Sequence, residues 1–327
     1  MQIFITGASG FIGSSLTKKL AEKGHKVVAL SRKGSTHPFL DNIPISRVIG
    51  DITEMDSLEK GMRGCDLLYH CAAKISFNRH EYKSIYQTNV EGTRNVIDSA
   101  SRSGIKRVVF VSACAVFGFS GKRREDRDEK SLPPLRPRNV YAYTKKLAEE
   151  IVLEYCAKGH DAVIANPCTV YGQGDLRLNS GTLIKAVYNS SMKYAPPGGT
   201  SVVSVDDLID GLILLSRDGA PGERYIFANE KLEFIDLINR IAKVSGARFV
   251  SKRIPRLLKM PAVLTASCIE LFKKDSIFIS SQIVKELFGY KYYSSKKARA
   301  ELGWDPKVNI EQAVLKAISF YKANGLW

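Results

Sequence analysis

Tyr141 and Lys145 are the two side chains of this sequence best suited to moving a proton, because they stand four residues apart. Residues at this spacing lie on one face of a helix, and the pattern of residues 141–158 predicts a helix. A phenol has an ordinary pKa of about 10, and a neighbouring ammonium favours its ionised form. The pair is therefore a candidate for chemistry at an alcohol or carbonyl oxygen, with Tyr141 as acid or base.

A glycine-rich run follows the first strand-like segment, residues 2–6, and a predicted helix over residues 13–23 comes directly after it. The run reads Gly7-Ala8-Ser9-Gly10-Phe11-Ile12-Gly13. Gly7 permits a tight turn, Gly10 lets the backbone approach a pyrophosphate, and Gly13 lets the helix pack closely on the strand. The free N–H groups at the helix N-terminus would bind the phosphates. We predict a nucleotide site here; a glycine-rich turn without a ligand is the alternative.

The end of the second predicted strand, residues 26–30, bears on the choice between the two nicotinamide cofactors. An NAD site usually has an acid here for the ribose hydroxyls, whereas a 2′-phosphate prefers arginine. The sequence continues Ser31-Arg32-Lys33, with two cations and no acid. Arg32 therefore favours NADP over NAD, unless it simply points at water. Asp51 and Ile52, after the third strand, are candidates to flank the adenine, or else form an ordinary helix cap.

Short apolar strands alternate with amphipathic helices in the first half of the chain, which predicts a doubly wound parallel sheet of the α/β class. The predicted strands are residues 2–6, 26–30, 47–49, 67–71, 107–112 and 162–166, with 202–205 and 225–228 further on. We expect a Rossmann domain over residues 1–172 and about 200–228. Residues 173–199 and 229–327 would form a smaller, interleaved, mainly helical substrate domain.

The formal net charge of the 327 residues is +16, which suits anionic ligands. Lysine and arginine are spread along the chain without a nucleic-acid-binding motif, so no nucleic-acid partner is predicted. No stretch approaches the roughly 20 apolar residues that span a bilayer, which predicts no integral membrane segment.

The N-terminus does not resemble a signal peptide, so a cytoplasmic location is expected. Six cysteines without CxxC spacing predict reduced thiols and no metal site.

Several motifs in a fixed order make the chain resemble the extended short-chain dehydrogenase/reductases, the NAD-dependent epimerase/dehydratase group. They are the glycine-rich run with Thr6, Gly-Asp-Ile at 50–52, His-Cys-Ala-Ala at 70–73, Asn-Val-Glu-Gly-Thr at 89–93, Val-Ser at 111–112, Tyr141 with Lys145, Asn-Pro-Cys-Thr-Val-Tyr-Gly at 166–172, Val-Asp-Asp at 205–207 and Glu-Leu-Gly-Trp-Asp-Pro at 301–306. The resemblance covers nearly the whole chain and implies an NAD(P)-dependent oxidoreductase.

The resemblance also implies roles for single residues. Ala72 and Ala73 would line the cofactor, unless they are simply small packing residues. Asn89 would support the helix that carries Tyr141, or only cap a helix. Pro167 and Thr169 would lie beside the nicotinamide, and Lys145 would hold its ribose. Members of the family are often dimers, so a homodimer through the helices over residues 89–103 and 141–158 is possible by analogy.

One position departs from the family pattern. After the fifth strand the family usually has two hydroxyl residues, the second of which binds the reacting oxygen, but this chain reads Ser112-Ala113. Alanine cannot donate a hydrogen bond, and neighbouring side chains on a strand point to opposite faces. Either the strand end bends so that Ser112 serves, or another donor replaces it, or activity is weak.

Residues 166–225 resemble the dihydroflavonol-reductase-like and hopanoid-associated epimerase branch, which implies a hydrophobic carbonyl compound or a nucleotide sugar as the substrate. Arg177, Lys185 and Lys193 are candidates to hold a diphosphate, or are solvated surface. Residues 253–274 predict a lid helix, in preference to one that rests on an anionic membrane, and the charged loop 121–138 predicts a flap. A catalytically weak nucleotide-binding sensor or scaffold on the same fold is the alternative function.

Overall fold

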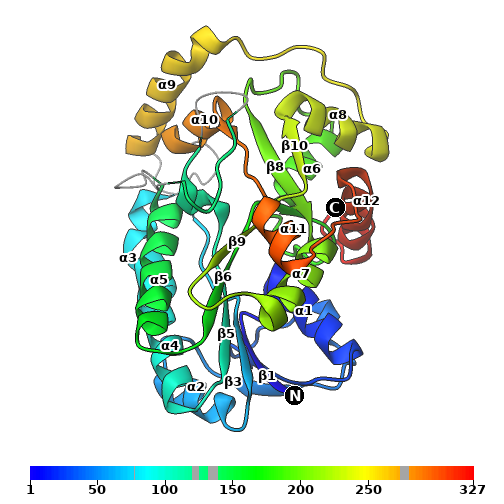
Figure 1. Ribbon diagram of the computed structural model, residues 1–327. Helices are drawn as coiled ribbons and strands as arrows, with labels where there is room; N and C mark the ends of the chain where they lie inside the picture. Colours follow the sequence, from blue (N-terminus) through cyan, green and yellow to red (C-terminus); the bar gives the residue numbers. More distant parts are fainter. Residues whose placement is uncertain (77, 120–124, 132–138, 273–279) are drawn as a thin grey trace.

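The structure of the protein is a computed structural model that describes residues 1–76, 78–119, 125–131, 139–272 and 280–327 (Figure 1). Most of the loop 121–138, predicted to be a flap, lies outside these ranges. In the described part of the chain no helix is both long and apolar enough to cross a bilayer.

A seven-stranded parallel sheet forms the larger lobe, with the strand order β3-β2-β1-β4-β5-β6-β9. Its strands are β1 (Gln2–Thr6), β2 (Lys26–Ser31), β3 (Ser46–Ile49), β4 (Leu67–His70), β5 (Arg107–Val111), β6 (Ala162–Pro167) and β9 (Arg224–Phe227). Helices cover both faces of this sheet, which is why the central strands are continuous apolar runs. The predicted α/β fold with a Rossmann sheet is confirmed, and the seven predicted strands agree with these bounds to within one residue.

Two layers of helices pack on the sheet because successive side chains of a strand face opposite sides. On β5, Val108 and Phe110 pack with α2 (Met55–Met62), α4 (Gly92–Arg102) and α5 (Val140–Ala157). Val109 and Val111 pack on the other face with α1 (Phe11–Glu22), α7 (Val205–Asp218) and α11 (Lys296–Leu302). The predicted helix over residues 89–103 starts as a π-helical turn, η3 (Gln87–Glu91), which continues a short α3 (Tyr82–Tyr86) into α4.

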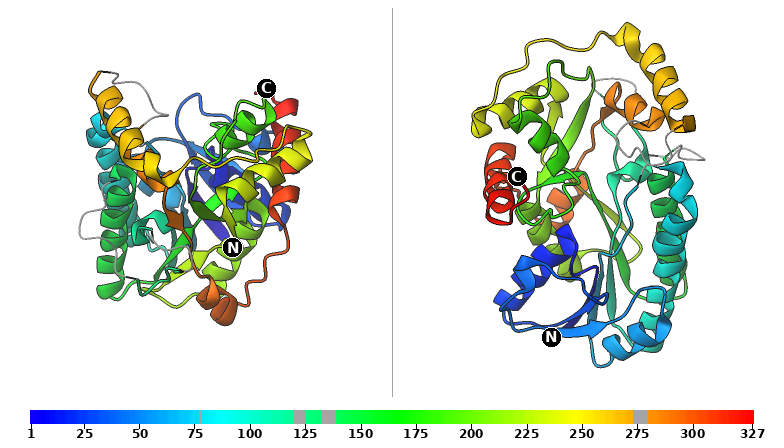
Figure 2. Two further views of the ribbon diagram at one scale, coloured as in Figure 1. Left: turned by 90° about the horizontal axis from the view of Figure 1, so that it is seen from above. Right: turned by 180° about the vertical axis from the view of Figure 1, so that it is seen from behind.

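A smaller sheet is built around β8 (Gly199–Ser204). It pairs with β7 (Thr169–Tyr171) and β11 (Tyr290–Lys291) in parallel and with β10 (Glu230–Glu233) in antiparallel orientation. The helices α6 (Gly181–Tyr188), α8 (Phe234–Ser245) and α12 (Ile310–Ala323) share its apolar core. The turn η5 (Arg256–Leu258), α9 (Lys259–Phe272) and α10 (Ser281–Leu287) extend this lobe over the carboxyl ends of the large sheet (Figures 1 and 2).

The segment 200–228, which we grouped with the Rossmann domain, is shared between the lobes. Its strand β9 joins the large sheet and α7 packs on that sheet, whereas β8 belongs to the small one. The proposed division into two domains thus stays a prediction.

A buried carboxylate ties the C-terminal segment back to the large lobe. Asp207, on α7, accepts hydrogen bonds from the backbone N–H groups of Lys307 (2.8 Å) and Val308 (3.0 Å). The indole of Trp304 donates to the carbonyl oxygen of Asp207 at 2.9 Å. The motifs at residues 205–207 and 301–306 therefore meet in one hydrogen-bond network, although about a hundred residues separate them in the sequence. The carboxylate supplies the acceptors that buried N–H groups need.

Candidate active site

The glycine-rich run forms a turn that is packed against the end of β4. Gly7 has a φ of +71°, and a Cβ atom on it would lie 2.6 Å from the backbone nitrogen of Ala72. A Cβ atom on Gly13 would lie 2.1 Å from the carbonyl oxygen of Gly7. Both positions therefore need glycine: Gly7 for the turn and its approach to β4, and Gly13 for the packing of α1 on the turn.

The N-terminus of α1 offers a cradle for phosphate groups. Gly10 is the N-cap and has no side chain to satisfy the first N–H groups of the helix, including those of Phe11 and Ile12. A Cβ atom on Gly10 would meet only the carbonyl oxygen of Gly7, at 3.2 Å, among protein atoms within 4 Å. The space that this Cβ would fill lies in front of N–H groups with positive potential, so the residues present fit the diphosphate of a dinucleotide.

Arg32 follows the last residue of β2 and is exposed. Among the residues that the structure describes, its side chain makes no ion pair. Asp51 accepts hydrogen bonds from the backbone N–H (3.0 Å) and the hydroxyl (2.9 Å) of Thr53, and the N-cap of α2 is Glu54. The carboxylate of Asp51 therefore closes a local turn and does not cap the helix. Ile52 is buried beneath α4, where a Cβ on Gly92 would come within 2.6 Å of it.

The loop after Arg32 is anchored by His37, which the sequence analysis did not single out. Its Nδ1 accepts from the N–H of Phe39 (3.1 Å), so its Nε2 carries the proton and donates to the carbonyl oxygen of Gly174 at 2.9 Å. Burial lowers the pKa of His37, which keeps the ring neutral. The contact joins the loop between β2 and β3 to the smaller lobe.

Asn89 reaches the helix of Tyr141 through one direct contact. Its Oδ1 accepts from the N–H of Lys74 (2.8 Å), and its Nδ2 donates to the carbonyl oxygen of Lys74 and to the hydroxyl of Thr144, both at 3.0 Å. The Thr144 hydroxyl in turn donates to the carbonyl oxygen of Tyr141 at 3.0 Å. Asn89 thereby fixes both the loop that follows Ala72 and Ala73 and the first turn of α5. Thr144 had no signal of its own in the sequence.

Lys145 is buried, with 2% of its surface exposed, against the carboxyl end of β5. Its Nζ donates to the carbonyl oxygen of Val111 at 2.7 Å and lies 4.2 Å from the ring centroid of Phe110. Burial lowers the pKa of Lys145 to about 7, although the charge of Glu149 opposes this shift. The ammonium group of Lys145 therefore releases its proton near neutral pH.

Tyr141 lies in the first turn of α5 and is partly enclosed. Burial raises the pKa of its phenol above the ordinary value, so the side chain is a neutral donor at physiological pH. The sequence predicted that the ammonium of Lys145 would lower the pKa of Tyr141, but the effect of burial is larger. The reason is geometric: the Lys145 ammonium is directed at the carbonyl oxygen of Val111.

The pairing of the strand end at Ser112 shows which face of the sheet the side chains of Ser112 and Ala113 take. The backbone N–H of Ser112 donates to the carbonyl oxygen of Ala165 at 2.8 Å, so the pairing of β5 with β6 continues through this residue. Side-chain alternation then puts Ser112 on the face of Phe110 and Lys145, and Ala113 on the opposite one. Ser112 is 3% exposed, and its hydroxyl has no hydrogen-bond partner within the described ranges. Such a buried group is costly unless something accepts its hydrogen bond.

Pro167 and Thr169 lie where the chain passes from the large sheet to the small one. Pro167 is buried at the end of β6, and Thr169 opens β7 with its hydroxyl 3.2 Å from that of Thr200. Of the diphosphate candidates, Lys185 is committed elsewhere, because its Nζ donates to the carbonyl oxygen of Leu326 at 3.0 Å. Arg177 and Lys193 are exposed.

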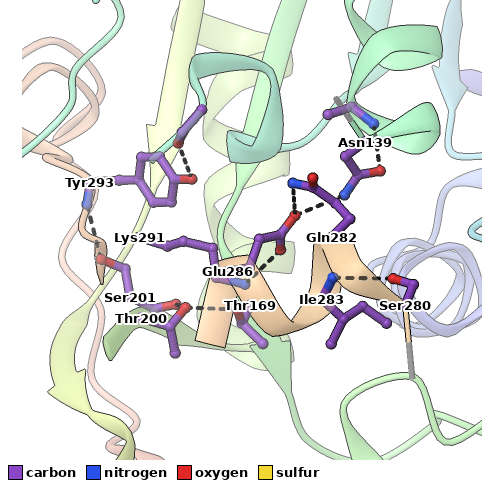
Figure 3. Close-up of polar contacts among 12 residues, drawn as sticks. Asn139, Thr169, Thr200, Ser201, Ser280, Gln282, Ile283, Glu286, Lys291 and Tyr293 are labelled. Atoms are coloured by element: carbon purple, nitrogen blue, oxygen red, sulfur yellow. Dashed lines mark hydrogen bonds and ion pairs between the residues drawn. The ribbon is translucent and has the colours of Figure 1, made fainter. Parts of the chain in front are cut away.

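The C-terminal lobe holds the N-terminus of the helix that carries Tyr141. Asn139 is the N-cap of α5, and its Oδ1 accepts from the N–H groups of Tyr141 (2.9 Å) and Ala142 (3.3 Å). Its Nδ2 donates to Glu286 of α10 at 3.0 Å, and Lys291 donates to the other carboxylate oxygen at 3.3 Å (Figure 3). An asparagine directly before a helix was the available signal for this cap, but the sequence analysis missed it.

A second contact from the same lobe reaches the turn after Ser112. The hydroxyl of Tyr293 donates to the carbonyl oxygen of Gly118 at 2.8 Å, where the short 3-10 helix η4 (Cys114–Phe117) ends (Figure 3). The backbone N–H of Tyr293 donates to the hydroxyl of Ser201 at 3.0 Å. Residues 280–293 therefore contact the N-cap of the helix that carries Tyr141 and the turn at Gly118, six residues after Ser112.

The buried ammonium of Lys145 predicts a pH-dependent difference in stability. Burial lowers the pKa of Lys145 in the folded chain to about 7, below its value in the unfolded chain, so the unfolded chain binds more protons and stability rises with pH from about 7. Replacing the side chain in Lys145→Met removes this contribution. Urea unfolding between pH 7 and 8.5 should show the wild type gaining about 1–2 kcal/mol over the variant. Lys146→Met, at a partly exposed neighbour, is the control, and a pH-independent difference for Lys145→Met would contradict the assignment.

The cap contact of Glu286 predicts a local effect on α5. Glu286→Ala leaves the amide of buried Asn139 without its acceptor, which should cost about 1–3 kcal/mol of unfolding free energy. Hydrogen exchange of the peptide that contains Tyr141 and Ala142 should accelerate, because the cap orientation is no longer fixed. Glu286→Gln, which keeps an acceptor, should restore most of the protection, and Lys285→Ala is the matched control. Unchanged exchange in Glu286→Ala would show that Asn139 holds its position alone.

Comparison with known proteins agrees with this geometry. A family model described as the NAD dependent epimerase/dehydratase family matches residues 3–228. A Synechocystis protein with a provisional dihydroflavonol 4-reductase name is 29% identical over 98% of this chain and 95% of its own. A 2-alkyl-3-oxoalkanoate reductase from Stenotrophomonas maltophilia is 28% identical over 98% of this chain and 99% of its own. The crystal structure of gox2253 matches with a TM-score of 0.87 and 26% identity, over 99% of this chain and 98% of that one.

The family model covers well over half of the chain, including the glycine turn, Ser112, and the Tyr141 and Lys145 pair. The chain belongs to the NAD-dependent epimerase/dehydratase family and is an NAD(P)-dependent oxidoreductase of the extended short-chain dehydrogenase/reductase type.

Proposed function

We propose that the protein is a reductase of lipophilic ketones that uses NADP(H) in preference to NAD(H). The observation that carries the proposal is the buried hydroxyl of Ser112, which lacks a partner in the described part of the chain and shares a sheet face with Lys145. A donor in this position fits the oxygen of a carbonyl substrate. It takes over the task that the resemblance assigns to the next position, where this chain has Ala113.

The cofactor would lie along the carboxyl ends of the strands. The turn of Gly7, Ser9, Gly10, Phe11, Ile12 and Gly13 would hold its diphosphate, and Arg32 its 2′-phosphate. Asp51 and Ile52 would flank the adenine, with Ala72 and Ala73 beside them, while Asn89, Lys145, Pro167 and Thr169 would shape the nicotinamide end. When bound, the nicotinamide supplies the hydride that the reduction needs.

The residues of the chain would then manage the substrate oxygen and its proton. The hydroxyl of Ser112 donates a hydrogen bond to the carbonyl oxygen, which holds the carbonyl carbon in place. As that carbon gains a hydride, the oxygen gains a proton from the phenol of Tyr141, and the product is an alcohol. The raised pKa of Tyr141 suits this direction, because the phenol is protonated before the reaction. Lys145, one helical turn further along α5, would hold the ribose of the cofactor.

Two findings favour a ketone over a nucleotide sugar as substrate. The two reported relatives carry the names of reductases, one of a dihydroflavonol and one of a 2-alkyl-3-oxoalkanoate. Lys185, a candidate to hold a diphosphate, is bonded to the C-terminal segment. Nucleotide-sugar epimerisation therefore takes second place. The cytoplasmic location and the homodimer stay predictions.

The choice of cofactor can be tested by titration. NADPH should bind more tightly than NADH to the purified protein, followed by nicotinamide fluorescence. Arg32→Glu should weaken NADPH binding about 10- to 100-fold, because it removes a charge-assisted hydrogen bond worth about 1.5–3 kcal/mol. NADH binding should change little. Lys33→Glu, the exposed neighbour, is the control. Equal affinity of the wild type for both cofactors would overturn the role of Arg32.

The chemical roles can be tested by turnover of a panel of long-chain and polycyclic ketones with NADPH. Ser112→Ala should lower kcat about 10²- to 10³-fold, and Tyr141→Phe about 10²- to 10⁴-fold. Both should keep NADPH affinity and thermal stability, because neither lost hydroxyl makes a hydrogen bond to another residue that the structure describes. Tyr143→Phe is the matched control. Unchanged turnover in Tyr141→Phe would refute its role, and a wild type that binds NADPH but reduces no ketone would favour the sensor.

A further inference from the structure

Four large apolar side chains are exposed close together in the sequence, in η5 and in the first turns of α9. They are Leu257 (91% exposed), Leu258 (48%), Met260 (62%) and Leu264 (61%). The described part of the chain exposes eleven large hydrophobic side chains, and these four fall within eight residues, so they form a patch and are not scattered singletons. We call residues 252–264 the docking segment.

The opposite side of α9 is already packed. Val263 is 7% exposed and Ala266 1%, and α9 packs on η5 and α10. The four exposed side chains therefore face solvent. Figures 1 and 2 show α9 at the outer edge of the molecule, beside α10.

The docking segment carries positive charge. Its sequence contains four cations (Lys252, Arg253, Arg256 and Lys259) and no acid. Arg253 pairs with Glu233 at 2.6 Å, and Arg256 donates to the hydroxyl of Tyr290 at 2.6 Å. Lys252 and Lys259 are exposed and make no ion pair within the described ranges, so their charges are free to meet an anionic surface.

We propose that the docking segment binds the surface of an anionic lipid membrane. Leucine and methionine side chains would enter the boundary between head groups and acyl chains, and the flanking lysines would meet lipid phosphates. A second copy of the chain fits less well, because a two-fold contact brings the same cations against one another. The net charge of +16 adds long-range attraction to the same surface.

The proposal is independent of the proposed function, although the two fit together. α9 packs on α10, whose Glu286 bonds the cap of the helix that carries Tyr141. The docking segment is thus one helix away from the site, where a membrane-dissolved ketone would have a short path to it. The earlier expectation of a lid over residues 253–274 becomes an outcome that the test distinguishes.

The test is co-sedimentation of the full chain with vesicles. Vesicles of phosphatidylcholine with phosphatidylglycerol should bind the protein, pure phosphatidylcholine should bind it weakly, and added salt should reduce binding. The double variant Leu257→Ser/Leu264→Ser should lower partitioning at least about tenfold, because two apolar side chains no longer enter the bilayer. Lys252→Glu/Lys259→Glu should act selectively on the anionic vesicles.

The controls are Ile49→Ser and Leu315→Ser, which remove exposed apolar side chains (62% and 46%) elsewhere on the surface and should leave binding intact. Thermal unfolding should be unchanged in all four variants, because every replaced side chain is exposed. A wild type that does not bind anionic vesicles would overturn the proposal, as would an equal loss of vesicle binding in the control variants.

Two other results would assign the patch differently. A dimer that dissociates in the leucine variant would assign it to a contact with a second copy of the chain. A leucine variant that loses turnover, in a protein that does not bind vesicles, would assign it to a lid. NADPH binding, measured separately, tests the proposed function and not the patch.

Discussion

The hydrogen bond from the buried ammonium of Lys145 to the carbonyl oxygen of Val111 is the interaction on which the rest of the site depends. It joins α5 to the carboxyl end of β5, where Ser112 follows. Burial makes this ammonium costly, and the ring of Phe110 and the carboxylate of Glu149 offset part of the cost. Glu149 is itself held by Arg224 and Asn166, each at 2.7 Å. One charge is thus connected to three strands of the sheet.

The direction of the parallel strands explains why the other candidate residues lie at one edge of the sheet. In a parallel sheet all carboxyl ends lie at one edge, and ligands of such sheets bind where the strand order reverses, which in this sheet is between β1 and β4. Gly7 ends β1 and packs on Ala72 after β4, so the glycine turn sits at that reversal. Arg32, Asp51 and Ser112 follow β2, β3 and β5 at the same edge. A chain with this topology brings together side chains that its sequence keeps far apart.

The smaller lobe does more than cover this edge. Residues 280–293 bond to the start of α5 through Glu286 and to the turn after Ser112 through Tyr293. Both lobes therefore contribute to the cap of the helix that carries Tyr141 and to the turn at Gly118. Since α9 packs on α10, any contact that α9 makes with a surface is adjacent to this junction.

Local pattern alone was enough to predict the strands of the large sheet, the glycine turn, and the shared helix face of Tyr141 and Lys145. These depend on residues near one another in the chain, where the periods of helix and strand and the absence of a Cβ act directly. The division of residues 200–228 between two sheets was not predictable in this way, because β8 pairs with strands from three distant segments.

Only the tertiary structure decided where the side chains of Ser112, Asn139 and Lys145 lie and what they contact. The sequence left open whether Ser112 or another donor replaces Ala113, and the pairing of β5 with β6 puts Ser112 on the side of α5. The bond between Asn139 and Glu286 spans 147 residues, and no local pattern encodes it. The pKa values of Tyr141 and Lys145 likewise reflect burial, which depends on how distant elements pack and not on the residues that flank each side chain.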